Sequence, residues 1–114
     1  MKKLILSIIF CFVSFYSFGY QIDENFTGQI IKKYKDGQVE SIENFKNGEM
    51  KNIRVFYENG NLKFEQNLKD RKGRYKGYYP NGQLEEEGEV FQGEKIGVWK
   101  YYNEEGKLSS EVIY

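Results

Sequence analysis

The chain has 114 residues, 18% of them aromatic, and its 17 Lys and Arg balance its 17 Asp and Glu, so its formal net charge is zero. Such a chain lacks the strongly basic face that nucleic-acid-binding proteins use, which excludes that class of partner. Histidine is absent and the single cysteine is Cys11, which excludes a disulfide framework and the usual His/Cys metal and catalytic sites. We therefore expect a protein that is not an enzyme and holds no cofactor or metal.

The first 19 residues have the pattern of a secretory signal peptide. Two lysines precede an apolar run from Leu4 to Phe18, and Ser17 and Gly19 are the small residues of a cleavage site. We expect a helical signal peptide that is cut after Gly19, and export to the periplasm, the cell envelope or the medium. The alternative is a retained membrane anchor, although the apolar run is shorter than the ~20 residues of a spanning helix.

Residues 20–26 are expected to form an irregular lead-in, and residues 27–114 a repeat domain. One short phrase recurs four times, as "YKDGQV" (34–39), "YENGNL" (57–62), "YPNGQL" (79–84) and "YNEEGKL" (102–108). Its turn glycines are 23, 22 and 24 residues apart: Gly37, Gly60, Gly82 and Gly106. A period in this range indicates a repeat architecture. The repeats are placed near 34–56, 57–78, 79–101 and 102–114.

Each repeat is predicted to be a β-hairpin. Asn-Gly and Asp-Gly provide the positive φ angles that tight turns need, and they stand between segments rich in Tyr, Phe, Val and Ile. A second turn falls near the middle of each interval, at 46–50, 69–73 and 92–97. Short connections make consecutive strands antiparallel, so the fold class is all-β, an elongated antiparallel meander in a single twisted sheet. Eight strands are expected, near 27–34, 38–45, 50–57, 61–68, 74–79, 83–91, 97–102 and 107–113.

The register of the third hairpin has two interpretations. A type I turn with Pro80 in second place and Gly82 in the left-handed position gives a three-residue loop, with Tyr78 opposite Leu84. A two-residue loop places Tyr79 opposite Leu84 instead and gathers the apolar residues on one face. Because a slip of one residue exchanges the two faces of a sheet, the alternatives expose different rings.

Aromatic residues provide the first candidate interaction surface. A sheet of this size has two faces that one small domain cannot both cover, so some rings should stay accessible. According to register, they are Trp99 with Tyr57, Tyr79 and Tyr102, or with their neighbours Phe56, Tyr78 and Tyr101. The alternative for each ring is the core, which we expect to be mainly a ladder of Tyr, Phe and Trp, with rings lying flat on Gly77 and Gly88.

Basic residues near the second of the midway turns provide the other candidate surface. Arg71, Lys72 and Arg74 are candidates to bind an acidic partner. The alternative is that this basic block pairs with the acidic block at 83–95 across a hairpin, with Lys76 facing Glu86 or Glu87. Each exposed pair of this kind contributes less than about 1 kcal/mol.

The segment "YYPNGQLEEEGEVFQGEKIGVWKYYNEEGKL" (78–108) resembles the MORN repeat, in the variant form of YwqK-type antitoxin proteins. The resemblance rests on the tyrosine, polar, Asn-Gly turns in register with "GVWKYY", and is best over 54–114. The chain departs from the fuller pattern at "EKIG", which lacks the His-Gly that often precedes the tryptophan strand. The resemblance implies an elongated twisted sheet without catalytic residues and a role in binding, and the antitoxin label implies neutralisation of a toxin by direct contact.

These observations predict an exported, non-catalytic module for protein-protein interaction. The partner is an unidentified protein, or a second copy that pairs with the terminal strand "KLSSEVIY" (107–114). The alternatives are an antitoxin-like neutraliser and a membrane or cell-envelope attachment protein, since MORN proteins are often discussed as lipid binders. Near-neutral charge argues against electrostatic binding to a lipid surface, where each Lys or Arg adds ~1 kcal/mol.

Overall fold

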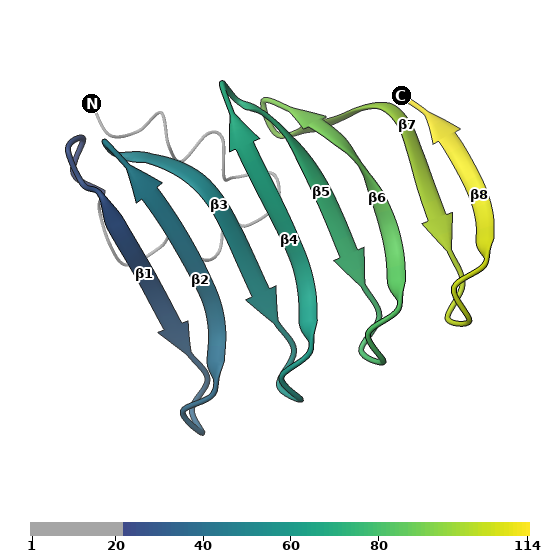
Figure 1. The fold of residues 1–114 in the computed structure, drawn as a ribbon, viewed down its shortest axis with the longest axis horizontal. Coiled ribbons are helices and arrows are strands. Elements are labelled where there is room, and N and C mark those ends of the chain that lie inside the picture. Colours follow the sequence, from purple (N-terminus) through teal and green to yellow (C-terminus); the bar gives the residue numbers. More distant parts are fainter. Residues whose placement is uncertain (1–21) are drawn as a thin grey trace.

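The computed structural model describes residues 22–114, which form one open antiparallel sheet (Figure 1). Its eight strands follow one another in chain order: β1 (Gly28–Lys33), β2 (Val39–Lys46), β3 (Glu49–Phe56), β4 (Leu62–Lys69), β5 (Lys72–Tyr78), β6 (Leu84–Phe91), β7 (Glu94–Tyr102) and β8 (Leu108–Ile113). The predicted all-β meander is confirmed. The predicted signal peptide and the cleavage after Gly19 lie outside the described residues.

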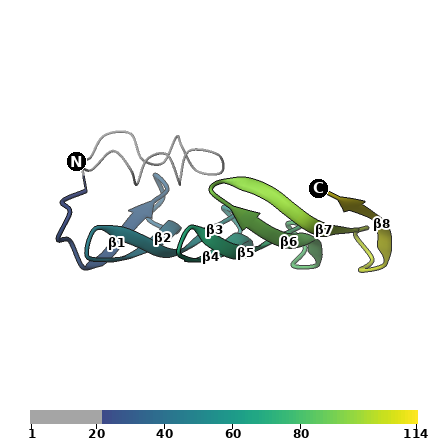
Figure 2. The same ribbon diagram turned by 90° about the horizontal axis from the view of Figure 1, so that it is seen from above.

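The strands lie in one layer, so the sheet has two faces (Figure 2). We call the face that carries the buried side chains of Ile53, Val55 and Phe64 the inner face, and the opposite face the outer face. Within residues 22–114, no helix has the length and apolar character needed to cross a membrane.

Two-residue turns join the strands at one end of the sheet, where β2, β4 and β6 end. All six turn residues have φ between 51° and 84°, as type I′ turns require: Asn47-Gly48, Asp70-Arg71 and Gln92-Gly93. Because the second and third of these turns are shorter than predicted, β5 and β7 begin earlier than expected, at Lys72 and Glu94. Gly97 lies within β7 and not in the turn, near the point where the β6–β7 register shifts between Glu87 and Glu89.

Five-residue loops join the strands at the opposite end of the sheet, which we call the loop end. All four loops share one hydrogen-bond pattern. The amide of the first residue donates to the carbonyl of the fifth at 2.8 Å, and the amide of the fourth residue donates to the carbonyl of the first at 2.9 Å. The fourth residue is the turn glycine in every loop, with φ between 89° and 95°: Gly37, Gly60, Gly82 and Gly106. The predicted four-fold repeat is confirmed at these positions.

The loops also resolve the register. Tyr78 lies opposite Leu84, as the type I turn predicts, and Tyr102 lies opposite Leu108 in the same way. The first residue of the loop is Tyr34, Tyr57, Tyr79 or, in the last hairpin, Asn103. Tyr102 is therefore equivalent to Tyr78 and not to Tyr79. The alignment of phrases was wrong here because "YNEEGKL" has one more residue between tyrosine and glycine than the other three phrases, so its tyrosine falls just before the loop.

Loop tyrosines bind successive hairpins to one another. The hydroxyl of each donates to the carbonyl of the residue just before the next loop, at 2.6, 2.6 and 2.7 Å: Tyr34 to Phe56, Tyr57 to Tyr78, and Tyr79 to Tyr102. The Asn81 amide adds a bond to the carbonyl of Glu104 at 3.3 Å. An isolated hairpin is marginally stable in water, so these bonds, at about 0.5–1.5 kcal/mol net each, make each unit depend on its neighbour.

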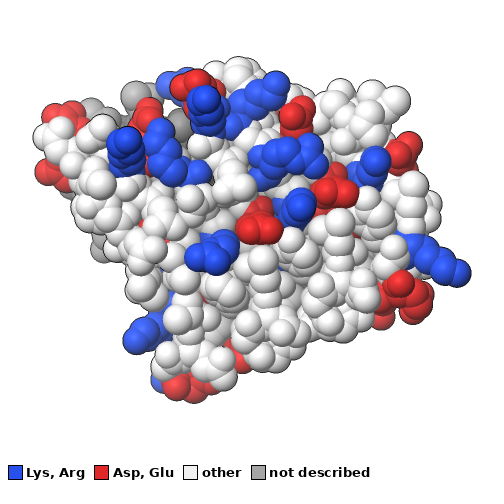
Figure 3. Space-filling view, viewed as in Figure 1, with Lys and Arg blue, Asp and Glu red and all other residues white. Residues whose placement is uncertain are grey.

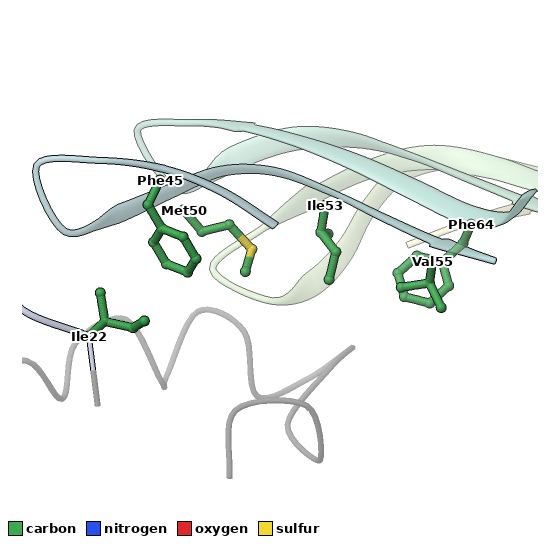
Figure 4. Close-up of a cluster of buried hydrophobic side chains, with 6 residues drawn as sticks. All are labelled: Ile22, Phe45, Met50, Ile53, Val55 and Phe64. Carbon is green, nitrogen blue, oxygen red and sulfur yellow. The ribbon is translucent and has the colours of Figure 1, made fainter. Parts of the chain in front are cut away.

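A hydrophobic cluster covers the inner face between the lead-in and β4. Its buried members are Ile22, Phe45, Met50, Ile53, Val55 and Phe64. In Figure 4 the side chains from the strands project from one side of the sheet, toward the side where Ile22 lies. The ring of Phe26 packs on that of Phe45 at 5.7 Å, and the Gly48 amide donates to the Phe26 carbonyl at 2.7 Å, which fastens the lead-in to this end of the sheet.

A run of rings continues the inner face from β4 to β7. Centroids are 5.5 Å apart for Phe64 and Tyr75, 5.5 Å for Tyr75 and Trp99, and 6.5 Å for Trp99 and Tyr101. The indole of Trp99 lies on Gly88, where an added Cβ would come within 3.0 Å of three indole atoms. The predicted aromatic ladder is right for this half of the sheet, whereas the other half mixes rings with aliphatic side chains.

Candidate interaction surface

The structure divides the predicted aromatic residues among three places. Alternation along the strands, fixed by the registers, puts Phe56, Tyr78 and Tyr102 on the outer face and Trp99 and Tyr101 on the inner face, while Tyr57 and Tyr79 belong to the loops. The two loop tyrosines are half-buried and use their hydroxyls to bind the next hairpin. Phe56, Tyr78 and Tyr102 therefore form the outer-face set, and all three side chains are half-buried.

Trp99 does not contribute an exposed ring. It is 0% exposed, and its indole N–H donates to the Glu89 carbonyl at 2.9 Å. The prediction of Trp99 as part of an exposed stripe is wrong, because Gly88 lets the indole lie flat on the backbone beside the ring of Tyr75.

Lys95 extends over the same rings. Its Nζ lies 4.5 Å from the Trp99 centroid and 5.4 and 5.6 Å from those of Tyr101 and Tyr114. The amine donates to the Tyr101 hydroxyl at 3.1 Å and lies 3.5 Å from the Glu86 carboxylate. Burial by itself lowers the pKa of Lys95, but the hydrogen bond to Tyr101 and the electrostatic effects of Glu86, Tyr101 and Tyr114 together outweigh burial and raise it. The Lys95 amine therefore already has partners within the sheet.

The three basic candidates lie at or near the Asp70-Arg71 turn. Arg71 is the second residue of the turn, and Lys72 is the exposed first residue of β5. The guanidinium of Arg74 lies 3.6 Å from the Glu87 carboxylate, so this residue takes the paired role that the alternative predicts.

One charged residue from each strand between β3 and β8 stands in a line across the outer face. The register pairs them in the order Arg54, Glu65, Lys76, Glu87, Lys100 and Glu111, and we call this line the charge row. Its signs alternate at every step, and Figure 3 shows the alternation of blue and red across the middle of this face. The expected facing of Lys76 and a glutamate is confirmed, with Glu87 as the partner.

Most side chains of the charge row form no ion pair with another residue of the described chain. Within residues 22–114, Arg54, Lys76, Lys100 and Glu111 form no ion pair, and all four are exposed. Glu87 is paired with Arg74, which lies outside the row. Four of the six charges therefore stay available to groups from another molecule.

An apolar stripe runs beside the charge row, on the side nearer the five-residue loops. It consists of three aromatic residues and the leucines opposite them: Phe56 with Leu62, Tyr78 with Leu84, and Tyr102 with Leu108. The rings follow the row residues of β3, β5 and β7 by two positions, which is about 7 Å along a strand. Five of these side chains are half-buried and Leu108 is 52% exposed. The stripe and the row form one surface.

Two tyrosines of the apolar stripe hold glutamates of the charge row in place. The Tyr78 hydroxyl donates to Glu65 at 2.9 Å, and the Tyr102 hydroxyl donates to Glu87 at 2.7 Å. Burial, followed by the bond to Glu65, raises the pKa of Tyr78 to about 12. The bond to Glu87 is the largest cause of the raised pKa of Tyr102. Both phenols stay protonated at neutral pH and keep the two carboxylates oriented.

A shallow polar hollow of about 440 Å³ opens at the β2–β4 end of this surface. It is lined by Asn44, Asn52, Ile53, Arg54, Glu65 and Asn67. The Asn44 amide donates to Asn52 at 2.7 Å. The hollow offers amide, guanidinium and carboxylate groups that can hydrogen-bond to a ligand. Among the described residues, no three His, Cys, Asp or Glu side chains gather as metal ligands.

Sequence reasoning missed the charge row and the leucines of the apolar stripe, although both leave a periodic signal. Each leucine follows a turn glycine by two positions: Leu62, Leu84 and Leu108. A basic residue stands six positions before each of the last three turn glycines, and a glutamate five positions after it. The corresponding positions around Gly37 are Ile31 and Ile42, so the row begins at the second hairpin.

Comparison with known proteins agrees with this arrangement. A family model described as the MORN repeat variant matches the chain four times, at residues 26–47, 52–70, 71–91 and 95–114. These matches cover more than half of the chain, and each contains one hairpin with its five-residue loop. No curated protein matches the chain.

Proposed function

Because the chain belongs to the MORN repeat variant family, we propose that it is an exported, non-catalytic binding module that recognises a protein partner through its outer face. The family match supports the repeat architecture, and the role in binding rests on the surface that the repeats build. Export rests on residues 1–19, whose lysines, apolar run and small residues before position 20 are typical of a signal peptide.

The observation that carries the proposal is the pairing of the apolar stripe with the charge row. Interfaces commonly join an apolar centre to a polar rim, and aromatic residues and arginine are enriched in them. Here the stripe supplies the apolar part, while Arg54, Lys76 and Lys100 are exposed charges without ion pairs among the described residues. Alternating signs favour a partner with a definite charge pattern over a uniformly charged polymer.

Capture from the native cell envelope tests this proposal. The full chain is immobilised, and the proteins it retains are compared with those retained by Lys76→Gln/Lys100→Gln and by the matched variant Lys35→Gln/Lys107→Gln, whose lysines lie in loops. We expect the outer-face variant to lose a specific protein that the loop variant retains. Identical capture by all three, with circular dichroism showing intact sheet, would refute a protein-binding outer face.

Two further measurements address the finer parts of the proposal. Amino-terminal sequencing of the secreted chain should begin at Tyr20, and a chain that still begins at Met1 in the membrane fraction would contradict cleavage. The antitoxin-like role expected from the YwqK resemblance would use the same outer face. Co-expression with a toxin encoded beside this chain should restore growth with the loop variant and fail to restore it with Lys76→Gln/Lys100→Gln.

A further inference from the structure

We infer that the partner segment is an amphipathic α-helix that lies across the strands, along the charge row and the apolar stripe. This inference rests on the proposed function and specifies the shape and charge pattern of the partner. It follows from the spacing of the row, its distance from the stripe, and the charges that the sheet leaves unpaired.

The spacing of the charge row matches a helix. Neighbouring strands are about 4.8 Å apart, so the five steps from Arg54 to Glu111 span about 24 Å. A helix that places a charge alternately three and four residues apart advances about 5.3 Å per step at 1.5 Å per residue, or about 26 Å over five steps. The mismatch of about 2 Å is distributed over the whole row and is absorbed by long Lys, Arg and Glu side chains.

An extended partner does not match the charge row. Side chains on one face of a β-strand repeat about every 6.8 Å, because two residues advance 3.4 Å each. Laid along the row, its charges would fall opposite the wrong sign after two steps. A strand added to a sheet edge also runs parallel to the strands and so would not follow a line that crosses them.

The width of the surface also fits a helix. The apolar stripe lies about 7 Å from the charge row, and a helix with its side chains is about 10–12 Å across. One helix therefore covers both, with leucine-like residues on the rings of Phe56, Tyr78 and Tyr102 and charged residues beside them on the row. This is the arrangement in which an amphipathic helix normally docks, with an apolar face down and charges at its border.

The signs of the charge row define the order of charges on the partner. Reading from β3 to β8, the helix carries Glu, Lys, Glu, Lys, Glu and Lys, opposite Arg54, Glu65, Lys76, Glu87, Lys100 and Glu111. Glu65 and Glu87 are already oriented by Tyr78 and Tyr102, so little side-chain freedom is lost there on binding. Because the charges of the charge row sum to zero, the row distinguishes partners by the order of their charges and not by their net charge.

Three synthetic peptides of about 20 residues test the inference by fluorescence anisotropy with the full chain. The first has a leucine stripe bordered by Glu and Lys in the alternating order above. The second has the same composition with all Glu in one half and all Lys in the other. The third is the first with a central proline, which breaks the helix. We expect the first to bind at least tenfold more tightly than either of the others.

Variants of the chain locate the binding site. Lys76→Gln/Lys100→Gln should weaken binding of the alternating peptide at least threefold and reduce its advantage over the block peptide, whereas Lys35→Gln/Lys107→Gln should change neither. Equal binding of the alternating and block peptides, undiminished binding of the proline peptide, or no binding of any peptide would overturn the inference. A change of oligomeric state in the outer-face variant would also overturn it, by identifying a second copy as the occupant. Because the capture experiment uses native proteins, it can still succeed when these peptide results are negative, so the two proposals fail separately.

Discussion

Replacing Gly88 with alanine is expected to destabilise the sheet through the ring that lies on it. The added Cβ would come within 3.0 Å of three atoms of the Trp99 indole, and carbon atoms prefer about 3.5–4.0 Å, so the ring must rise by at least about 0.5–1 Å. That shift weakens the 2.9 Å bond from the indole N–H to the Glu89 carbonyl. Gly88 has no left-handed φ, so the backbone itself accepts alanine and the effect is steric.

The magnitude follows from two contributions. Overpacking a filled site costs about 1–3 kcal/mol, and loss of the indole hydrogen bond costs about 0.5–1.5 kcal/mol. The free energy of unfolding should therefore fall by about 2–4 kcal/mol, measured by urea unfolding followed by circular dichroism. Ser110→Ala, at an exposed position of β8, is the control and should stay within about 0.5 kcal/mol of the wild type.

A double-mutant cycle separates the ring contact from other effects of the alanine. Trp99→Phe replaces the indole with a smaller ring, so Gly88→Ala should cost less in that background, with a coupling of at least about 1 kcal/mol. Full additivity, or a Gly88→Ala chain as stable as Ser110→Ala, would show that the indole does not rest on this backbone.

Three other perturbations test the loops, the turns and the outer face. Tyr57→Phe removes the hydroxyl that donates to the Tyr78 carbonyl and should lower the free energy of unfolding by about 0.5–1.5 kcal/mol, with the exposed Ser110→Ala again as the control. Arg71→Gly relieves a side chain held at φ 67° and should stabilise the sheet by about 1 kcal/mol, and a loss of stability would contradict the turn geometry. Tyr78 has a pKa of about 12, raised from its ordinary 10.0, so its contribution is complete below pH 10 and is lost as pH rises toward 12. Tyr78→Phe should therefore lose less stability than the wild type over that interval, and parallel losses would contradict the assignment.

The repeat itself could be predicted from the sequence because turn chemistry is local. Asn-Gly and Asp-Gly turns at a regular spacing define the hairpins, and the four turn glycines do occupy one place in the loop. The boundaries of β5 and β7 were predicted less well, since Gly73 and Gly97 suggested turns where the chain continues as a strand. Arg71 adopts the left-handed conformation that sequence reasoning assigns to glycine, and the neighbouring strands impose it through their pairing.

The face of each ring could not be predicted because it depends on single-residue shifts. The loops put a register shift beside Tyr78 and beside Tyr102, and this shift decides which rings reach the outer face. Trp99 was assigned to the surface although its site on Gly88 was foreseen as a place for a ring, because the sequence does not reveal which ring occupies it. The charge row could have been predicted from the sequence, since its residues keep constant offsets from the last three turn glycines.

The hydrogen bond from each loop tyrosine to the carbonyl of the residue just before the next loop determines how such chains can change length. Every junction between hairpins uses the same donor and acceptor positions, so duplication or deletion of one whole unit of 22 to 24 residues leaves each remaining junction intact. Each added unit would also extend the outer face by one cation and one anion. A lineage of these proteins can thus lengthen or shorten its recognition surface in fixed increments, without redesigning a core.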